Sequence, residues 1–536
     1  MTMNLLELPY PSRRMPVVGR RGVVATSQPI ATQAGLRLLE AGGNAVDAAL
    51  AMAATLTVVE PTSNGLGSDA FALIWDGLRL HGLNGSGRAP AALTLDRVRQ
   101  AGHTTMPDLG WLSVTVPGAP RAWHDLHQRF GRRPFAEVLA PAIQAAEGGY
   151  PVSPIVAAGW QRTAQVYADN KGPEFAPWFD TFTWEGRGPA AGDMVRFPDH
   201  ARTLRRIVES GADDYYLGET ARAFVDFAAA TGGVITADDL AGHTSTWVEP
   251  ISTSYRGHEV WEIPPNGQGL TALLALNILE NFDLRRLGRE SLKAYHLQIE
   301  AMKLAFADAH RYIADPEHAD VPTQGLLSKE YAAGRAKLIG DRARAREPGD
   351  PPRGGTVYLC AADGDGLMIS YIQSNFAGFG SGIAIPGTGI ALQNRGRGFS
   401  LDPAHPNVLA PRKRPYHTII PAFLTRDGQA IGPFGVMGGH MQPQGHTQMA
   451  LNTIDWGLNP QASLDAPRWQ VTQGLDVIVE TGVPTAVVAG LLDRGHQVTV
   501  EPSISAFGRG QIIWRQPNGA YFAGSDPRAD GCALGL

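Results

Sequence analysis

The chain has 536 residues, of which 43% are hydrophobic and 18% charged, a composition that suits a large globular protein with a sizeable buried core. Its formal net charge of −5 and its pI near 6.3 argue against nucleic acid as a partner. The two cysteines, Cys360 and Cys532, are too few for a disulfide framework and lack the spacing of a metal site.

Nothing in the sequence predicts an export signal or a membrane span. The first residues, MTMNLLELPYPSRR, hold no continuous apolar stretch, which a secretory signal requires. No run of about 18 apolar residues occurs. We therefore expect a cytoplasmic protein without a membrane partner.

The length suggests about three or four domains. No linker or charged block divides the chain, so we expect fewer domains than the length alone suggests.

The N-terminal region is predicted to form a strand and two helices. Gly22–Thr26 is a short β-rich run, and Ser27 can cap a helix over residues 30–39. The glycine pair at 42–43 closes that helix, as glycines do at helix C-termini. A second helix over residues 45–58 has small side chains on several faces, so it can pack closely against a sheet.

The next predicted elements are a glycine-rich turn over residues 64–68 and a strand over residues 70–75. The turn lacks the G-x-x-x-x-G-K-[ST] pattern and has no basic residue nearby, which excludes a phosphate-binding loop. Residues 114–116 are predicted as a strand. Pro141 is predicted to open a helix that runs to about Glu147, because proline is best tolerated at the first helical position.

Two helices farther along carry more specific signals. Thr236, followed closely by two aspartates, is typical of a capped helix N-terminus with an acidic first turn. A helix over residues 296–312 places His296 and Glu300 at positions i and i+4, a spacing that can hold a metal. No third ligand lies nearby in the sequence and no H-E-x-x-H motif occurs, so a helix with one face in water is favoured over a metal site.

A pair of strands is predicted around Thr356. Residues 356–361 form a β-rich run, residues 363–366 (Asp-Gly-Asp-Gly) suit a hairpin turn, and residues 367–372 return as the second strand. The preceding residues 341–352 are charged and proline-rich, which indicates an exposed and flexible segment.

Three motifs resemble the γ-glutamyltranspeptidase family of N-terminal-nucleophile hydrolases. They are the run from Ser27 to Ala49, which includes G-G-N-A-V-D-A-A, the Gly-Gly-Thr stretch at 354–356, and the tail from Gly524 to Gly531. The resemblance covers nearly the whole chain. It implies an α+β fold, a four-layer αββα sandwich, in which the chain cuts itself between Gly355 and Thr356. The large subunit (residues 1–355) and the small subunit (residues 356–536) would stay interlocked as one domain.

The resemblance also implies how Thr356 would act. Cleavage gives Thr356 a free α-amino group, whose ordinary pKa is near 8. The neutral amine can take the proton of the Thr356 hydroxyl, so one residue supplies nucleophile and base. In the family a hydroxyl residue bonds the nucleophile, and Ser374 matches it. A Gly-Gly pair stabilises the oxyanion, and Gly438 and Gly439 match that pair.

The positions that would bind substrate depart from the family pattern. Gly398 stands where the family has the Asp that pairs with a γ-glutamyl α-amino group. Ser86 stands where it has the Arg that holds the α-carboxylate, and Arg88 lies two residues later. The other candidates for substrate binding are Phe376, His417 and Thr418, which stand at family positions, and the arginines Arg395 and Arg397. Compared with the family pattern, this chain lacks the acid that would pair with an α-ammonium group and has additional arginines. These differences favour a substrate that carries a carboxylate but no α-ammonium group. A structural ion pair is the competing interpretation of each arginine.

The interpretation that we favour is an autoprocessing amidohydrolase that forms an acyl-enzyme at Thr356 and passes the acyl group to water. The alternatives are a true γ-glutamyltranspeptidase (glutathione hydrolase), an oxamate-type amidohydrolase, and an uncleaved binding protein on the same scaffold. No cofactor and no metal is expected, and His440 and His446 are interpreted as turn or packing residues. The expected partners are a small-molecule amide and the two subunits of one precursor. The oligomeric state stays open, a homodimer of the heterodimer included.

Overall fold

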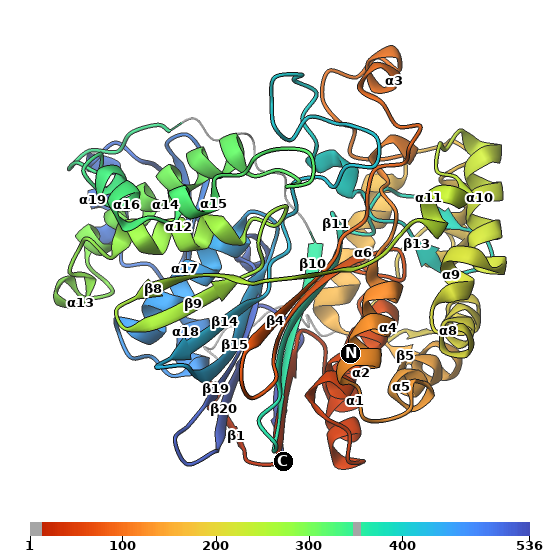
Figure 1. Ribbon diagram of the computed structural model, residues 1–536, viewed down its shortest axis with the longest axis horizontal. Helices are drawn as coiled ribbons and strands as arrows, with labels where there is room; N and C mark the ends of the chain where they lie inside the picture. Colours follow the sequence, from red (N-terminus) through yellow and green to blue (C-terminus); the bar gives the residue numbers. More distant parts are fainter. Residues whose placement is uncertain (1–12, 347–354) are drawn as a thin grey trace, which may run out of the picture.

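The computed structural model describes residues 13–346 and 355–536. Two seven-stranded sheets lie face to face, and helices cover the outer face of each sheet (Figure 1). This arrangement is the α+β, four-layer αββα sandwich that the family resemblance predicts. Residues 347–352, part of the segment predicted to be exposed and flexible, lie outside the described residues.

The first sheet contains Thr356 and is antiparallel throughout. Its order is β21-β2-β10-β11-β3-β4-β7, and the central pair, β10 and β11, is the pair predicted around the Asp-Gly turn. The strand bounds are β21 Cys532–Gly535, β2 Gly22–Thr26, β10 Gly355–Asp363, β11 Met368–Phe376, β3 Asp69–Trp75, β4 Leu80–Gly85 and β7 Thr246–Val248.

The second sheet has the order β1-β20-β19-β15-β14-β9-β8. Its strand bounds are β1 Val17–Gly19, β20 Tyr521–Ser525, β19 Arg509–Arg515, β15 Gln429–Met437, β14 Ala422–Arg426, β9 His258–Glu262 and β8 Ile251–Tyr255. Both sheets mix strands from residues 13–346 with strands from residues 355–536. Neither part of the chain therefore completes a sheet by itself.

The helices fall into two groups, one outside each sheet (Figure 1). The helices that precede β7 in the chain are α1 Pro29–Glu40, α2 Ala45–Val59, α3 Leu95–Gln100, α4 Ala119–Phe130, α5 Phe135–Gly148, α6 Pro154–Tyr167, α7 Ala176–Phe182, α8 Pro198–Ser210, α9 Asp213–Leu217, α10 Glu219–Thr231 and α11 Ala237–Ala241. The others are α12 Gly269–Leu279, α13 Leu284–Leu287, α14 Leu292–Tyr312, α15 Thr323–Leu326, α16 Lys329–Ala336, α17 Met441–Ile454, α18 Pro460–Asp465 and α19 Thr485–Asp493.

Short elements complete the chain. They are the strands β5 Tyr150–Pro151, β6 Met194–Val195, β12 Ala384–Ile385, β13 Ile390–Ala391, β16 Trp469–Gln473, β17 Asp476–Glu480 and β18 Gln497–Glu501, and the 3₁₀ turns η1 Trp111–Ser113, η2 Arg395–Gly398 and η3 Ile504–Phe507. Across the two described stretches, no helix combines the length and the apolar character needed to cross a membrane.

Apolar side chains fill the spaces between the four layers. Between the sheets, Phe71 and Tyr358 of the first sheet belong to one cluster with Phe423 and Ile513 of the second. Helix α2 is buried along its whole length, as its apolar residues on every side require. The prediction of a helix packed closely on a sheet is thus confirmed, because α2 contacts β10 and β11 directly.

The start of α1 differs from the prediction. Gln28, rather than Ser27, caps the helix, because the Gln28 side-chain oxygen accepts the N–H groups of Ile30 and Ala31. Ser27 instead donates a hydrogen bond to the Glu60 carboxylate at 2.5 Å. The helix start offers N–H donors, which Gln28 accepts, whereas the buried Glu60 carboxyl needs a donor, and the Ser27 hydroxyl supplies it.

Two further local predictions are wrong. Residues 114–116 form no strand and are irregular backbone that follows η1. Helix α5 begins at Phe135 and continues through Pro141, which the sequence predicted as its first residue. The buried face of α5, which includes Val138 and Leu139, stabilises the helix although Pro141 cannot make one of its backbone hydrogen bonds.

The predicted N-cap at Thr236 is confirmed by a capping box with Asp239.

Candidate active site

Thr356 is the second residue of β10 and its side chain is buried. Gly355 pairs with Phe376 and Val357 with Gln373, so the ladder shifts register and one additional residue of β11 lies opposite Thr356. Such bulges re-aim side chains and are common beside active sites. Thr356 Oγ1 lies 3.1 Å from Ser374 Oγ, within hydrogen-bond distance.

Ser374 also fixes the end of β11. Its Oγ accepts the Phe376 N–H at 2.7 Å. Phe376 has a φ of +77°, the left-handed region that a bulky residue enters only at a cost of about 1–3 kcal/mol. In this conformation the Phe376 ring stacks on Arg395, whose guanidinium carbon lies 4.4 Å from the ring centroid. Ser374 thus connects Thr356 to the neighbouring arginine.

Four of the predicted substrate-binding residues line a single pocket of about 240 Å³: Phe376, Arg395, Arg397 and Thr418. The pocket lies next to the Gly355–Thr356 bond, because Phe376 pairs with Gly355 across the ladder. Its other lining residues include the rings of His310, Phe399, Tyr416 and His440. The pocket therefore has a cationic part and an aromatic part.

Arg395 is almost completely buried. Its Nη1 donates to Thr418 Oγ1 at 2.7 Å, whereas Nε and Nη2 are buried without a hydrogen-bond partner among the described residues. Burial lowers the pKa of Arg395 to about 9, and the Asp69 carboxylate opposes that shift, so the guanidinium is protonated at neutral pH. A buried cation with two unsatisfied donors is costly to maintain and is suited to an entering carboxylate.

The other two predicted arginines make ion pairs. Arg397 lines the pocket, and its Nε pairs with the Asp108 carboxylate. Arg88 is not among the lining residues; its Nη2 lies 2.7 Å from Glu317. Arg88 therefore matches the alternative that the sequence left open, an arginine in a structural ion pair, rather than a residue of the pocket.

His417 also lies outside the set of lining residues, although it precedes Thr418. Its Nε2 is 3.0 Å from Asp69 Oδ2, and both side chains are fully buried. No motif in the sequence pointed to Asp69. The available signal was a carboxylate at the first position of a strand that is otherwise apolar.

Gly438 and Gly439 join β15 to α17 with φ angles of +130° and +63°, which glycine adopts without a steric penalty. The Gln268 side chain donates to the Gly439 carbonyl at 2.9 Å and to the Thr418 carbonyl at 2.6 Å. One amide thus ties the glycine turn to the pocket. His440, interpreted from the sequence as a turn or packing residue, lines the pocket.

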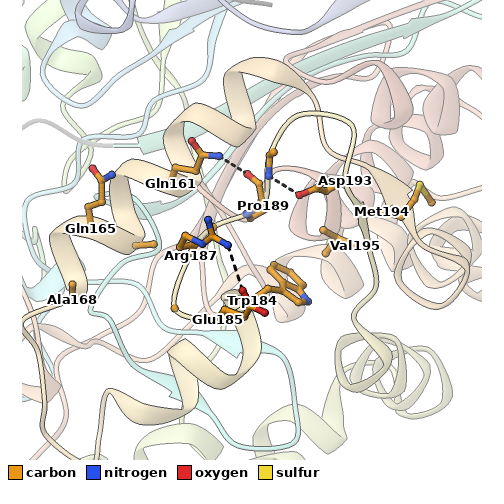
Figure 2. A pocket seen from close by; sticks show the side chains of 14 residues that line it. Gln161, Gln165, Ala168, Trp184, Glu185, Arg187, Pro189, Asp193, Met194 and Val195 are labelled. Atoms are coloured by element: carbon orange, nitrogen blue, oxygen red, sulfur yellow. Dashed lines mark hydrogen bonds and ion pairs between the residues drawn. The ribbon is translucent and has the colours of Figure 1, made fainter. Parts of the chain in front are cut away.

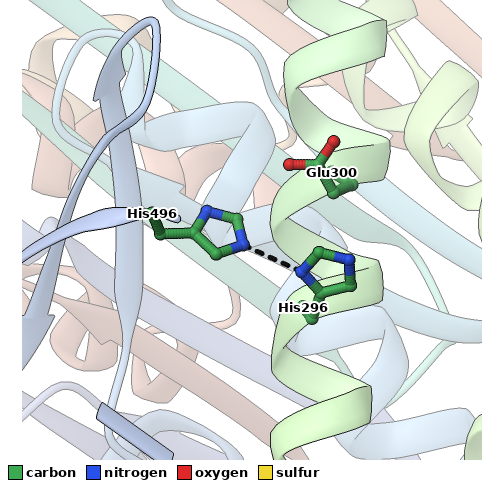
Figure 3. A group of neighbouring side chains, drawn as sticks. All are labelled: His296, Glu300 and His496. Atoms are coloured by element: carbon green, nitrogen blue, oxygen red, sulfur yellow. Dashed lines mark hydrogen bonds between the residues drawn. The ribbon is translucent and has the colours of Figure 1, made fainter. Parts of the chain in front are cut away.

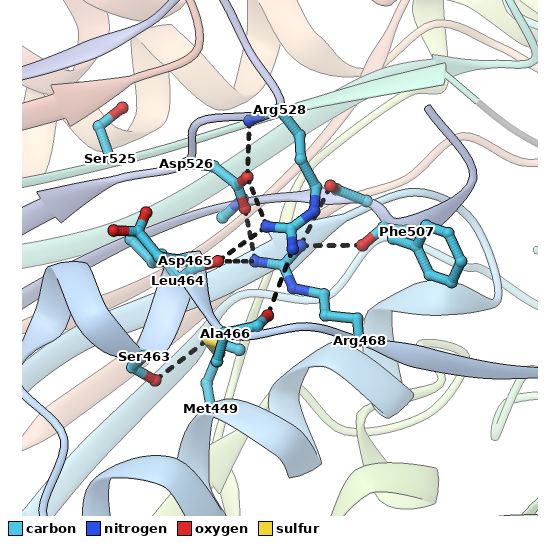
Figure 4. Close-up of polar contacts among 12 residues, drawn as sticks. Met449, Ser463, Leu464, Asp465, Ala466, Arg468, Phe507, Ser525, Asp526 and Arg528 are labelled. Carbon is cyan, nitrogen blue, oxygen red and sulfur yellow. Dashed lines mark hydrogen bonds and ion pairs between the residues drawn. The ribbon is translucent and has the colours of Figure 1, made fainter. Parts of the chain in front are cut away.

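Figure 4 shows a buried ion-pair network formed by Arg468, Asp526 and Arg528. Arg468 donates to the carbonyls of Phe507 (2.8 Å) and Gly508 (3.1 Å) and pairs with Asp526 at 2.5 Å. A Cβ added to Gly438 would lie 3.1 Å from the Gly508 Cα, so the two backbones are in close contact. The tail motif, through Asp526, therefore holds the backbone that packs against Gly438.

Comparison with known proteins places this chain in a family. The sequence profile described as gamma-glutamyltranspeptidase matches residues 31–536. The chain belongs to the γ-glutamyltranspeptidase family. It is 54% identical to a cephalosporin acylase from Bacillus halodurans whose crystal structure is known, with a TM-score of 0.97 over 100% of this chain and 99% of that one.

Curated members of the γ-glutamyltranspeptidase family are also similar over their whole lengths. The glutathione hydrolase-like YwrD proenzyme of Bacillus subtilis is 37% identical over 531 residues, 97% of this chain and 99% of the relative. The oxamate amidohydrolase proenzyme of Klebsiella pneumoniae is 36% identical over 535 residues, with the same coverage. This family member is therefore an enzyme of the amide hydrolase or acyltransferase type.

The structure brings a third side chain, His496, to His296 and Glu300 of α14 (Figure 3). The three groups lie within 4.8 Å of one another, although His296 and His496 are 200 positions apart in the sequence. His296 Nδ1 and His496 Nε2 are 2.9 Å apart and share a hydrogen bond, and Glu300 pairs with the buried Lys303. These contacts make the cluster a polar network between α14 and the residue that precedes β18. The prediction that this helix has one face in water is wrong, because α14 is buried from Ala294 to Phe306.

A larger cavity, of about 790 Å³, lies beside α6 (Figure 2). Its polar groups satisfy one another locally: Gln161 donates to the Pro189 carbonyl at 3.1 Å, and Arg187 pairs with Glu185 at 3.4 Å. None of the site residues predicted from the family resemblance lines this cavity.

Proposed function

We propose that this protein is an autoprocessing amidohydrolase in which Thr356 hydrolyses amides whose acyl group carries a carboxylate. The observation that supports it best is the pairing of Thr356 Oγ1 with Ser374 Oγ at 3.1 Å, beside a pocket in which two buried Arg395 donors have no partner in residues 13–346 and 355–536. The relatives act, by their names, on oxamate and on cephalosporins. These two different substrates support amide hydrolysis as the reaction of this protein but do not identify its substrate.

Maturation begins when Thr356 Oγ1 attacks the carbonyl carbon of Gly355. The Gly355–Thr356 C–N bond breaks, the acyl group moves to the Thr356 oxygen as an ester, and the released amine takes up the proton. Water then hydrolyses the ester, leaving a carboxylate on Gly355 and a free α-amine on Thr356. Gly355 has no side chain to hinder the approach to its carbonyl.

Catalysis repeats this chemistry on an amide substrate. The neutral α-amine of Thr356 accepts the hydroxyl proton as Oγ1 attacks the carbonyl, and the leaving amine departs with that proton. Ser374 orients Oγ1, and the N–H groups of Gly438 and Gly439 serve as oxyanion donors. Water hydrolyses the acyl-enzyme ester to give the free acid.

Arg395 sets the substrate class in this proposal. Its Nε and Nη2 lie on one edge of the guanidinium, which matches the two oxygens of a carboxylate. Gly398, also in the pocket, offers no acid to a γ-glutamyl α-ammonium group. Glutaryl amides and oxamate, which have the carboxylate without the ammonium, should therefore be better substrates than γ-glutamyl amides.

The test is a comparison of wild type, Thr356→Ala and Thr356→Ser. Wild type and Thr356→Ser should give two bands on a denaturing gel, and Edman sequencing should return Thr-Val-Tyr-Leu for the small wild-type chain. Thr356→Ala should remain one chain of 57.2 kDa without activity. An active wild-type preparation that stays a single chain would contradict the proposal.

Substrate class is tested with glutaryl, γ-glutamyl and pentanoyl anilides and with oxamate. Arg395→Met should raise KM for the glutaryl anilide by about ten- to a hundredfold, the equivalent of one charge-assisted contact. It should leave the neutral pentanoyl anilide unchanged. A wild-type preference for the γ-glutamyl anilide would favour the glutathione hydrolase alternative.

A further inference from the structure

Asp69 is a buried carboxylate on the strand next to the proposed catalytic residues. It is the first residue of β3 and pairs with Ser374 across the β3–β11 ladder. One oxygen, Oδ1, accepts the Gly87 N–H at 3.1 Å, and Oδ2 lies 3.0 Å from His417 Nε2. The Ile419 N–H donates to His417 Nδ1 at 3.4 Å, which leaves Nε2 as the nitrogen that donates to Asp69.

Two sets of contacts hold Asp69 and Arg395 on one framework. Thr418, next to His417, accepts the hydrogen bond of Arg395 Nη1 at 2.7 Å. The Gln393 N–H donates to the Gly67 carbonyl at 3.1 Å, so the chain that leads into β3 runs beside the chain that leads to Arg395. A change of charge on Asp69 is therefore felt at the arginine through a fixed and largely dry medium.

The two charges stabilise each other. Burial raises the pKa of Asp69 to about 7, and Arg395 is the leading influence that opposes the rise. The other charged or titratable groups near Asp69 are Arg414, the neutral His417, and the buried tyrosines Tyr215 and Tyr216 of α9. The backbone N–H groups of Gly87 and Gly118 also lower the pKa of Asp69. Asp69 is the carboxylate that offsets the burial of Arg395. With the pocket empty, Arg395 thus already has an internal counter-charge.

We propose that Asp69, held by His417, is a positioning residue for substrate recognition, and that binding of an acyl carboxylate at Arg395 is coupled to proton uptake by Asp69. The inference rests on the proposed function, because it takes Arg395 as the carboxylate site. A second anion near Arg395 repels ionised Asp69 and favours its protonated form. By linkage, the substrate carboxylate binds more tightly at pH values where Asp69 is already protonated.

The kinetic test compares KM for the glutaryl and pentanoyl anilides between pH 6 and pH 8, below the pKa of about 9 of Arg395. In wild type, KM for the glutaryl anilide should rise about fivefold across this range, as a coupling of one pKa unit above the pKa of about 7 of Asp69 gives. KM for the neutral pentanoyl anilide should not rise, which separates the effect from titration of the Thr356 amine. Asp69→Asn keeps an oxygen for His417 and should lower KM for the glutaryl anilide and abolish the rise that begins near pH 7, although the loss of the Asp69 charge lowers the pKa of Arg395 and limits the comparison to the lower part of this range.

Glu262→Gln is the matched control. Glu262 and His446 form a second buried carboxylate–histidine pair, with Glu262 Oε1 2.7 Å from His446 Nδ1, on the other sheet and outside the pocket. This variant should keep the wild-type pH dependence. The proposal is overturned if Asp69→Asn keeps the wild-type rise in KM, or if it changes KM equally for the charged and neutral anilides, as a merely structural role would.

Calorimetry on the wild type provides a measurement that needs no folded variant. Glutarate binding at pH 8, measured in two buffers of different ionisation enthalpy, should take up a substantial fraction of one proton per site, and pentanamide binding should take up none. Equal proton uptake for glutarate and pentanamide overturns the coupling. An enzyme that cleaves amides but shows no uptake refutes this inference alone, whereas a protein that never cleaves refutes the proposed function.

Discussion

Ser374 Oγ lies 3.1 Å from Thr356 Oγ1 and at the same time accepts the Phe376 N–H at 2.7 Å. One hydroxyl therefore touches the proposed nucleophile and holds a strained residue that lines the pocket. Phe376 has a φ of +77°, and the Ser374 hydroxyl accepts its N–H in that conformation. The nucleophile and the carboxylate site are therefore connected through Ser374 and Phe376, whose ring lies over the Arg395 guanidinium.

Replacing Ser374 by Ala should lower kcat by about ten- to a hundredfold, because Thr356 loses the group that orients its hydroxyl and the Phe376 N–H loses its acceptor. Steady-state kinetics on the matured protein measure the effect. Ser370→Ala is the control, since Ser370 is equally buried on β11 but bonds the Tyr358 hydroxyl at 2.7 Å. Equal losses in both variants would refute a special role for Ser374.

Replacing Gly438 by Ala should reduce kcat/KM by about a hundredfold or more. A φ of +130° is unfavourable for alanine, and the new Cβ would lie 3.1 Å from the Gly508 Cα, so the proposed oxyanion turn has to move. Gly428→Ala is the control, because that glycine also has a positive φ but has open space around it. It should cost about 1 kcal/mol of stability without a loss of activity.

Replacing Arg468 by Met should destabilise the fold by about 3–5 kcal/mol, since it leaves the Asp526 carboxylate buried without this partner and frees the carbonyls of Phe507 and Gly508 (Figure 4). Urea denaturation measures the change. The exposed pair of Arg205 and Glu147 offers the contrast: Arg205→Met should leave the midpoint of urea denaturation nearly unchanged, because water screens an exposed ion pair. Similar costs for both variants would contradict the role of the network.

His200 should contribute to acid lability. Burial lowers the pKa of His200 to about 4, while its Nε2 is 2.8 Å from Thr57 Oγ1. Because the unfolded chain binds the proton more tightly, the stability is fully present above about pH 6.5 and is lost as pH falls towards 4. The loss reaches about 3 kcal/mol at most. His200→Gln should lose less stability than wild type between pH 7 and pH 4.5, measured by urea denaturation, and an equal loss would refute the assignment.

The motifs of the sequence indicated the family, and the αββα architecture followed from that resemblance, whereas the central strand pair follows from a local pattern. The Asp-Gly turn and the glycine motifs specify backbone conformation within a few residues, and the mostly apolar run of α2 specifies a buried helix. Local rules failed where a distant partner competed: Glu60 takes the Ser27 hydroxyl from the start of α1, and packing carries α5 through Pro141.

The tertiary structure decided which candidate side chains share a pocket. Arg395 and Thr418 meet there, while Arg88 pairs with Glu317 and His417 turns to Asp69. All four are polar residues in loops or turns, and their sequence spacing carries no information about the partner that each one finds. Only the folded chain fixes those partners, because a buried charge is held by whichever opposite charge or dipole the packing brings within a few ångströms.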